Sequence, residues 1–335
     1  MDRAKRALFV TLSILFILPF VLDNYFLHIF IIIFLGVIYG QSWNLLGGFT
    51  GQISFGHALF FGIGSYGTMR FLTSEKLLDF GGLFGHQIDP IIAIIFGAII
   101  TMLVTLLLGM IIFRLKGPYL GLGTLALAEI GFVIAMNWKS VTNGGEGILL
   151  LDTFSLGPFE LAGKTSFYYL VMFIAIFSIW LVSKIMKSKF GYYLLAIRED
   201  DDAAEAIGVP TQKYKTYSLT VSAFLASLAG GFHALYVGFV SPEGAFSVHL
   251  SVEMIFITIV GGVGTIFGPV AGAVVLTVLG ELFKSYFDNA YLVVYGLLLI
   301  FVILYMPEGI YGYIKKLFKI EKEGDSPCQN YESQI

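Results

Sequence analysis

Long apolar stretches recur along almost the whole chain, and they limit its fold more than any other feature. They are too long and uninterrupted for amphipathic surface helices, and they lack the period-two alternation of membrane β-barrel strands. A helical span of a bilayer needs about 20 apolar residues, so we expect an all-α polytopic membrane protein. The stretches lie at about residues 7–22, 25–46, 58–72, 91–113, 119–137, 166–187, 214–238, 251–284 and 291–306.

Composition excludes an exclusively soluble fold. The 335 residues are 57% hydrophobic and only 13% charged, whereas a soluble domain carries about 25% charged residues. The net charge of −3 provides no general attraction to nucleic acid, which we do not expect as a partner. The lone cysteine, Cys328, excludes an intrachain disulfide and multi-cysteine metal sites. The five histidines are scattered and no H-E-x-x-H motif occurs, so we expect neither a metal nor a cofactor.

The basic residues predict the orientation, because Lys and Arg concentrate in cytoplasmic loops. Most of the 20 Lys and Arg residues cluster in four regions that we expect to be cytoplasmic: the N-terminus, 114–116, 184–215 and 315–322. The basic residues before 7–22 resemble the start of a signal peptide, but no cleavage site follows, so we expect a retained span. Segments with few basic residues are expected outside: 74–90, 138–165, 239–250 and 285–290.

The stretch 251–284 must cross the membrane an even number of times, because the segments before and after it, 239–250 and 285–290, are both expected outside. It is too short for two full helices at 1.5 Å per residue, so we infer two shortened helices that meet at 261–264 (GGVG). This gives about ten crossings, within a range of eight to ten, and places both termini in the cytoplasm. Residues 1–320 form a single transmembrane domain in this interpretation, and 321–335 form a polar cytoplasmic tail.

A second glycine-rich break lies at 47–56 (GGFTGQISFG) and resembles 261–268 (GGVGTIFG), since both begin with two glycines and end in Phe-Gly. Paired interruptions are typical of transporters whose broken helices line a midplane pathway. The match indicates an internal repeat or a coincidence in a glycine-rich chain. Glu129, central in an apolar stretch, pairs either with a substrate ammonium or with a neighbouring helix. The candidate pathway residues are Gln52, Ser54, His57, Glu129, Gly261, Gly262 and Gly264.

Two apparent nucleotide-binding motifs fail on their context. The segment 62–67 (GIGSYG) has the G-x-G-x-x-G spacing, but it lies inside an apolar stretch, which favours helix packing through small residues. The segment 163–165 (GKT) lacks the earlier glycine that a P-loop requires, because position 158 is proline. If ATP drives this protein, a separate subunit must hydrolyse it.

The segment 191–210 predicts a short cytoplasmic helix between two spans. Its acidic residues at 199–202 suit a first helical turn, and the alanines that follow favour a helix interior. Gly208 is placed for a C-terminal cap and Pro210 prevents continuation. A helix of this kind can dock in a groove of a partner and transmit its motion.

Family resemblance becomes specific at this segment. Residues 202–208 (DAAEAIG) resemble the E-A-A-x-x-x-G motif of ABC-importer permeases, with Asp in place of Glu. The chain is similar over about 40–285 to branched-chain amino-acid permeases of the LivM type. It differs at Pro118, where we expect an acidic residue, and at 125–129 (LALAE), where we expect more glycine. The segments that carry this similarity are 45–58 (LLGGFTGQISFGHA), 114–119 (RLKGPY), 142–148 (TNGGEGI) and 260–265 (VGGVGT).

The resemblance implies a transport subunit, not an enzyme, in a prokaryotic cytoplasmic membrane. Its substrates would be branched-chain or related small amino acids. It implies as partners two ATP-binding subunits, a homologous second permease and an extracytoplasmic substrate-binding protein, besides the lipid bilayer. The residues that it implies in coupling to the ATPases are Arg198, Glu199, Asp200, Asp201, Asp202, Ala203, Ala204 and Gly208.

Three alternatives stay open. A permease for urea or short amides belongs to the same wider family. An ion-coupled secondary transporter would also explain broken helices, but it would transport without any ATPase. A membrane-embedded enzyme would need a nucleophile, base or metal constellation, and we find none in the sequence.

Overall fold

The computed structural model describes residues 13–73, 89–150, 155–156, 159–160, 163–287 and 309–317, with isolated positions at 296, 300, 304 and 306. These residues are almost entirely helical. The long and medium helices are α2 (Asn24–Trp43), α3 (His57–Thr73), α5 (Asp89–Ile112), α6 (Pro118–Asn137), α8 (Lys164–Met186), α9 (Lys189–Glu199), α11 (Thr211–Val237), α13 (Val248–Gly261), α14 (Gly268–Phe287) and α16 (Gly309–Leu317). The short elements are η1 (Leu18–Phe20), η2 (Asn44–Gly48), α7 (Lys139–Thr142), η3 (Gly144–Glu146), β1 (Ile148–Leu149), β2 (Ser155–Leu156), β3 (Phe159–Glu160), α10 (Asp201–Ala206), β4 (Phe239–Val240) and α12 (Pro242–Ala245).

Six helical segments within the described residues are long and apolar enough to cross a membrane. They support a multi-pass membrane protein, but they do not confirm the expected ten crossings. The expected span at 291–306 lies mostly outside the described residues, as do the N-terminal basic residues and the tail 321–335. The cytoplasmic location of both termini therefore stays a prediction. The six segments are Asn24–Gly48, Pro90–Ile112, Pro118–Asn137, Lys164–Met186, Thr211–Val237 and Pro242–Gly261.

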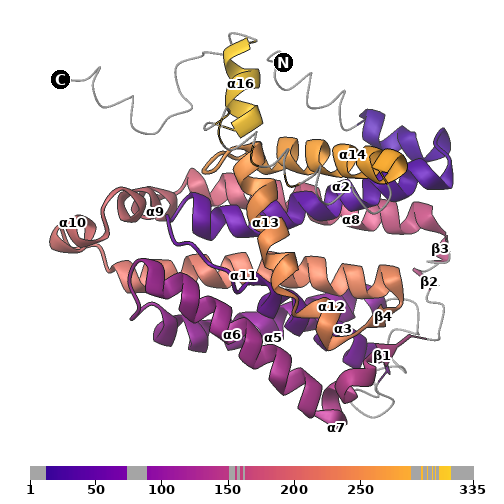
Figure 1. Cartoon of the computed structure of the whole chain (residues 1–335), viewed down its shortest axis with the longest axis horizontal. Coiled ribbons are helices and arrows are strands. Elements are labelled where there is room, and N and C mark those ends of the chain that lie inside the picture. The colour runs from indigo at the N-terminus through magenta and orange to yellow at the C-terminus, as the bar shows by residue number, and fades with distance from the viewer. Residues whose placement is uncertain are drawn as a thin grey trace.

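The helices form two layers (Figure 1). One layer contains α2, α8 and α14, the other contains α3, α5, α6 and α11, and contacts between α2 and α11 join them. Small residues allow the backbones in the second layer to approach closely: a Cβ added to Gly67 of α3 would lie 2.9 Å from the Cα of Gly97 of α5. The packing interpretation of 62–67 is thus confirmed, since helices in membranes associate through such small residues.

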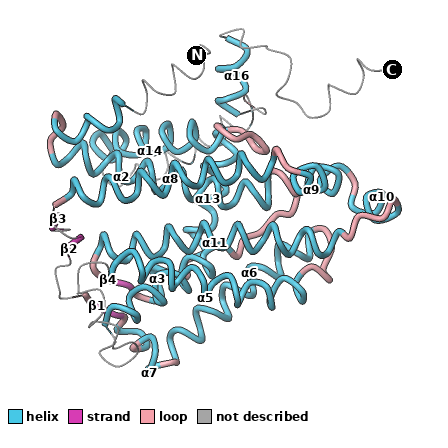
Figure 2. Tube along the Cα trace, turned by 180° about the vertical axis from the view of Figure 1, so that it is seen from behind, coloured by secondary structure: helices cyan, strands magenta, loops and turns pink. Residues whose placement is uncertain are grey.

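The loops gather at two opposite ends of the bundle (Figure 2). At one end β1 pairs with β4, which places 148–149 beside 239–240. At the other end α9 and α10 project, and Lys116 bonds to Asp202. Among the described residues, the second end carries most of the lysines and arginines, in loops and at helix ends, namely Arg114, Lys116, Lys184, Lys187, Lys189, Arg198, Lys213 and Lys215. The positive-inside rule therefore predicts that this end is cytoplasmic.

Both expected helix breaks are present. α2 ends at Trp43 and continues as one π-helical turn, η2, before a non-helical segment leads to α3 at His57. α13 ends at Gly261 and α14 begins at Gly268, so a six-residue loop, 262–267, separates them. We call 44–56 the first break and 261–268 the second break. Each leaves backbone N–H and C=O groups without helical partners, which must be satisfied elsewhere within a membrane.

Candidate functional site

The two breaks contact each other through one buried side chain. Asn44 lies at the end of α2 and is fully buried. Its Nδ2 donates to the carbonyl oxygen of Thr265 at 2.8 Å, and its Oδ1 accepts from the backbone N–H of Gly264 at 2.8 Å. A primary amide presents one donor and one acceptor side by side, so it can replace two bonds of an interrupted helix. Asn44 therefore ties the first break to the second.

Further polar side chains satisfy the second break. Gln41 Nε2 donates to the carbonyl of Ile266 at 2.6 Å. Thr265 Oγ1 donates to the carbonyl of Gly262 at 2.8 Å and accepts from the N–H of Gly268 at 3.0 Å. Our sequence analysis missed Gln41 and Asn44. Two amide side chains at the end of an apolar stretch, directly before a glycine pair, were the signal that could have revealed them.

Glycine permits the close approach of the two breaks. A Cβ added to Gly48 would collide with the Asn44 side chain and lie 2.7 Å from the backbone nitrogen of Gly264. Gly264 has a φ of 73°, in the left-handed region that side chains disfavour. Of the predicted glycines, Gly264 lies where the two breaks meet. Gly261 and Gly262 lie within the second break, where a Cβ added to Gly261 would collide with the carbonyl of Gly268.

Ser54, near the end of the first break, and His57, the first residue of α3, are fully buried. The carbonyl of Ser54 accepts from Trp43 Nε1 at 2.8 Å, and His57 Nε2 lies 2.8 Å from Ser222 Oγ of α11. Both residues are enclosed in the contacts among α2, α3 and α11. Gln52 is only half-buried, and its Nε2 donates to the carbonyl of Thr50 at 3.3 Å.

Glu129 is not part of this cluster. It is exposed on α6, on a face that also carries Leu122, Ile130 and Val133. The buried face of α6 contacts the first break instead, because Thr124 Oγ1 accepts from the N–H of Phe55 at 3.1 Å. The structure thus separates Glu129 from the other candidate pathway residues.

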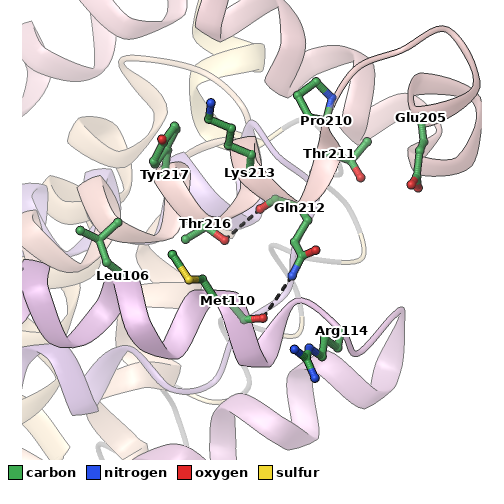
Figure 3. A pocket seen from close by; sticks show the side chains of 10 residues that line it. All are labelled: Leu106, Met110, Arg114, Glu205, Pro210, Thr211, Gln212, Lys213, Thr216 and Tyr217. Atoms are coloured by element: carbon green, nitrogen blue, oxygen red, sulfur yellow. Dashed lines mark hydrogen bonds between the residues drawn. The ribbon is translucent and has the colours of Figure 1, made fainter.

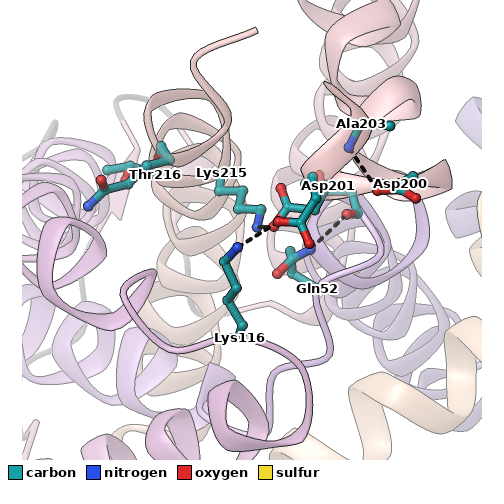
Figure 4. Close-up of polar contacts among 10 residues, drawn as sticks. Gln52, Lys116, Asp200, Asp201, Ala203, Lys215 and Thr216 are labelled. Carbon is teal, nitrogen blue, oxygen red and sulfur yellow. Dashed lines mark hydrogen bonds and ion pairs between the residues drawn. The ribbon is translucent and has the colours of Figure 1, made fainter. Parts of the chain in front are cut away.

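A short helix, α10, lies in the segment 191–210, and the three aspartates at its start have partners within the chain (Figure 4). Asp200 caps α10 by accepting from the N–H of Ala203 at 2.9 Å. Asp201 pairs with Lys215, whose side chain is only 6% exposed. Asp202 pairs with Lys116 at 2.7 Å, and this hydrogen bond lowers the pKa of Asp202 and raises the pKa of Lys116. These pairs attach α10 to α11 and to the turn after α5.

The outward surface of α10 is formed by other residues. Ala204 is buried in a small cluster with Ile197 and Val209, so it packs α10 against its own chain. Ala203 and Gly208 are exposed, as is Glu199, and Ile207 is 80% exposed. Gly208 has a φ of 94°, which fits the expected helix-terminating position.

Arg198, the penultimate residue of α9, lies against both breaks. A Cβ added to Gly51 would lie 3.3 Å from its Cγ, and one added to Gly264 would meet its guanidinium. The structure therefore brings the predicted coupling segment directly onto the two breaks. Among the described residues, no group of three or more His, Cys, Asp or Glu side chains could hold a metal ion.

The chain matches the family model described as "Branched-chain amino acid transport system / permease component" over residues 25–303. It is 27% identical to the Escherichia coli (strain K12) "High-affinity branched-chain amino acid transport system permease protein LivM". The alignment covers 90% of this chain and 74% of that protein. It is 24% identical to the "Probable branched-chain amino acid transport permease protein LivM" of Methanocaldococcus jannaschii, over 75% of this chain and 77% of the relative.

A further relative is the "High-affinity branched-chain amino acid transport system permease protein LivH" of Salmonella typhimurium. It is 27% identical to this chain, and the alignment covers 56% of this chain and 63% of the relative. No solved structure matches the chain. The relatives are transport permeases, not enzymes, and the match of the family model extends over most of the chain. The chain belongs to the family of branched-chain amino acid permease components and is LivM-like within it.

Proposed function

We propose that this protein is the LivM-like permease subunit of an ATP-driven importer in a prokaryotic cytoplasmic membrane. Its substrates are branched-chain or related small amino acids, as the names of its relatives indicate for those proteins. Within the structure, the contact of Arg198 with both breaks carries the proposal. A transport subunit driven from outside the bilayer needs a mechanical connection between a cytoplasmic element and the helices that move, and Arg198 is placed to provide one.

The proposed assembly contains a second, homologous permease, two ATP-binding subunits and an extracytoplasmic substrate-binding protein. Alignment with both LivM-named and LivH-named relatives supports the second permease. The exposed face of α6 is its proposed contact surface. Glu129 lies among apolar side chains there, and a carboxylate facing lipid is costly. Contact with a second subunit, or with a pathway between the two, would remove that cost.

In the proposed mechanism the ATPases bind the exposed surface of α10, around Ile207 and Gly208. Their closure moves α9 and α10 together, because Ala204 packs the two helices against each other. Arg198 transmits this movement to the two breaks, and Asn44 makes them move as a unit. α2, α3, α13 and α14 are then displaced relative to the rest of the bundle, which opens the pathway toward the cytoplasm.

Reconstitution in proteoliposomes tests the proposal. The chain is assembled with its second permease, the binding protein and the ATPases encoded beside it, and uptake of radiolabelled leucine is measured with and without internal ATP. Leucine uptake that needs both ATP and the ATPase subunits is the expected result. Uptake by the permeases alone, driven by a proton or sodium gradient, would contradict an ATP-driven importer. Uptake of urea or short amides in preference to leucine would contradict the proposed substrate class.

A further inference from the structure

A cavity of about 640 Å³ lies beside the α9–α10 element (Figure 3). It is bounded by the C-terminal part of α5, the N-terminal part of α11 and the segment that connects α10 to α11. None of the candidate pathway or coupling residues lines it. The cavity is thus separate from the two breaks, although it lies at the same end of the bundle.

One part of the cavity is polar and carries a positive excess. Arg114 and Lys213 contribute two cations, and both are exposed. Glu205 contributes a single acid. Gln212 fixes the connection between the helices, since its Nε2 donates to the carbonyl of Met110 near the end of α5 at 3.1 Å. Two cations against one carboxylate favour an anionic group such as a phosphate.

The remaining wall is apolar and continues onto the surface of α5. Leu106, Met110 and Tyr217 line it (Figure 3). Beyond the cavity α5 exposes Leu103, at 60%, and Leu107, at 67%. An apolar helix surface of this kind on a membrane span faces lipid chains. The cavity therefore joins a basic, water-facing end to a surface suited to an acyl chain.

We propose that this cavity binds the headgroup of an anionic phospholipid from the leaflet on the α9–α10 side. The phosphate lies against Arg114, and one acyl chain runs along Leu106 and the exposed face of α5. Lys213 extends from the other side of α11, with its Nζ 5.8 Å from the centroid of the Tyr217 ring, and adds a second positive charge to the field of the cavity (Figure 3). Basic pockets between membrane helices on the cytoplasmic side are suited to anionic headgroups. Assignment of this leaflet as cytoplasmic rests on the orientation used in the proposed function. The binding chemistry itself does not depend on it.

Occupancy of the cavity would influence the coupling element. Glu205 belongs to α10 and Pro210 to the connection that follows, and both line the cavity. A bound headgroup contacts the connection between α10 and α11 and restrains it. Lipid composition then sets how firmly α10 is held against the bundle.

The test uses the purified full chain in nanodiscs and in detergent, with native mass spectrometry and thermal unfolding as readouts. Phosphatidylglycerol is the probe, phosphatidylcholine is the neutral lipid control, and soluble glycerol 1-phosphate tests the headgroup without its acyl chains. Free leucine is added in a separate arm. We expect retention of phosphatidylglycerol and a raised unfolding temperature with that lipid, and no effect of phosphatidylcholine, glycerol phosphate or leucine at the same concentration.

Charge variants make the test specific. Each interfacial cation contributes about fivefold in affinity for anionic lipid, so Arg114→Gln with Lys213→Gln should reduce retention by about 25-fold. Glu205→Gln removes the opposing charge and should increase retention. The matched control is Lys189→Gln, which removes an exposed cation at the same end of the bundle but outside the cavity.

Lipid retention is expected to fall in the double variant and to rise in Glu205→Gln. The proposal can therefore still be tested with Glu205→Gln if the double variant does not fold. Unchanged retention in the folded double variant, an equal loss in Lys189→Gln, or a decrease in Glu205→Gln would overturn the lipid site. Stabilisation by leucine or glycerol phosphate without phosphatidylglycerol would assign the cavity to a soluble ligand instead. None of these readouts involves ATP or transport, so failure here is distinct from failure of the proposed importer function.

Discussion

The side chain of Asn44 holds the backbone of Gly264, with its Oδ1 accepting the glycine N–H at 2.8 Å. This bond joins the end of α2 to the loop between α13 and α14. Because the same amide also donates to Thr265, loss of the side chain leaves one backbone donor and one backbone acceptor without these partners in a half-buried location. The junction of the two breaks thus depends on one residue.

Asn44→Ala should strongly destabilise the protein. A buried backbone group left without a partner costs about 1–3 kcal/mol. Two backbone groups are affected here, and each should cost less than this because both are only half-buried. Thermal unfolding of the purified chain measures the loss. Asn137→Ala is the matched control, because it removes an amide that bonds to the carbonyl of Val133 at an exposed position. Equal unfolding temperatures for the two variants would refute the junction.

Gly48→Ala should also lower the unfolding temperature, by a steric mechanism. Its Cβ would collide with Asn44 and press on Gly264, so the two breaks must separate. Gly280→Ala in α14 is the control, since a Cβ there meets nothing within 4 Å. Alanine in a helix interior is favoured over glycine by about 0.5–1 kcal/mol, so Gly280→Ala should be neutral or stabilising. The substitution is therefore expected to lower the unfolding temperature at Gly48 but not at Gly280.

Arg198→Gln should uncouple ATP hydrolysis from transport. The variant keeps the exposed surface of α10 but loses the guanidinium contact at Gly264. We expect the ATPases to co-purify normally and to hydrolyse ATP, while leucine transported per ATP falls at least severalfold. Lys189→Gln, which removes a cation from the start of the same helix, should leave the ratio unchanged. Loss of ATPase binding in Arg198→Gln would indicate a docking residue instead of a transmitting one.

Asp201 and Lys215 should show a strong energetic coupling in a double-mutant cycle. Removing one partner of a fully buried ion pair costs about 3–5 kcal/mol, and the cost here should be smaller because the Asp201 side chain is 25% exposed. Lys215→Met alone should loosen α10, and Lys215→Met combined with Asp201→Leu should restore much of the loss. Additive single effects, measured by thermal unfolding, would exclude the pairing.

The exposed pair Lys116–Asp202 predicts how the attachment of α10 depends on pH. The lowered pKa of Asp202 means that its stabilisation is present above the ordinary value of 3.8 and is lost as pH falls through the folded value. The raised pKa of Lys116 means that its contribution is present below 10.5 and is lost only as pH rises beyond the folded value. The protection of the backbone amides of 201–206 against hydrogen exchange, after correction for the intrinsic exchange rates, should therefore be constant between pH 3.8 and pH 10.5. A change near neutral pH would be contrary to this assignment.

Several local features could be predicted from the sequence. The helical membrane architecture follows from apolar stretches of spanning length, and both breaks follow from glycine pairs within them. The short helix α10 follows from its acidic start and from Gly208 and Pro210. All of these depend on residues close together in the chain, so local backbone preferences and hydropathy determine them. The number of crossings depends less on local sequence. A helix such as α14, which is not among the six described segments that are long and apolar enough to span a membrane, crosses or does not cross according to how it packs against its neighbours.

The sequence by itself determined that this protein is a helical membrane protein with two interrupted regions and a charged element at its basic end. Only the tertiary structure decided which residues join these parts. Asn44 and Gly264 are 220 positions apart, and Lys116 and Asp202 are 86 apart, so no local pattern pairs them. For the same reason Asp201 and Asp202, expected to face a partner, pair with lysines of their own chain. Burial imposes the partners of Asn44 and Lys215, since a polar group removed from water must find a partner wherever the packing provides one. Lys116 and Asp202 stay exposed and pair because the fold places α10 beside the turn after α5.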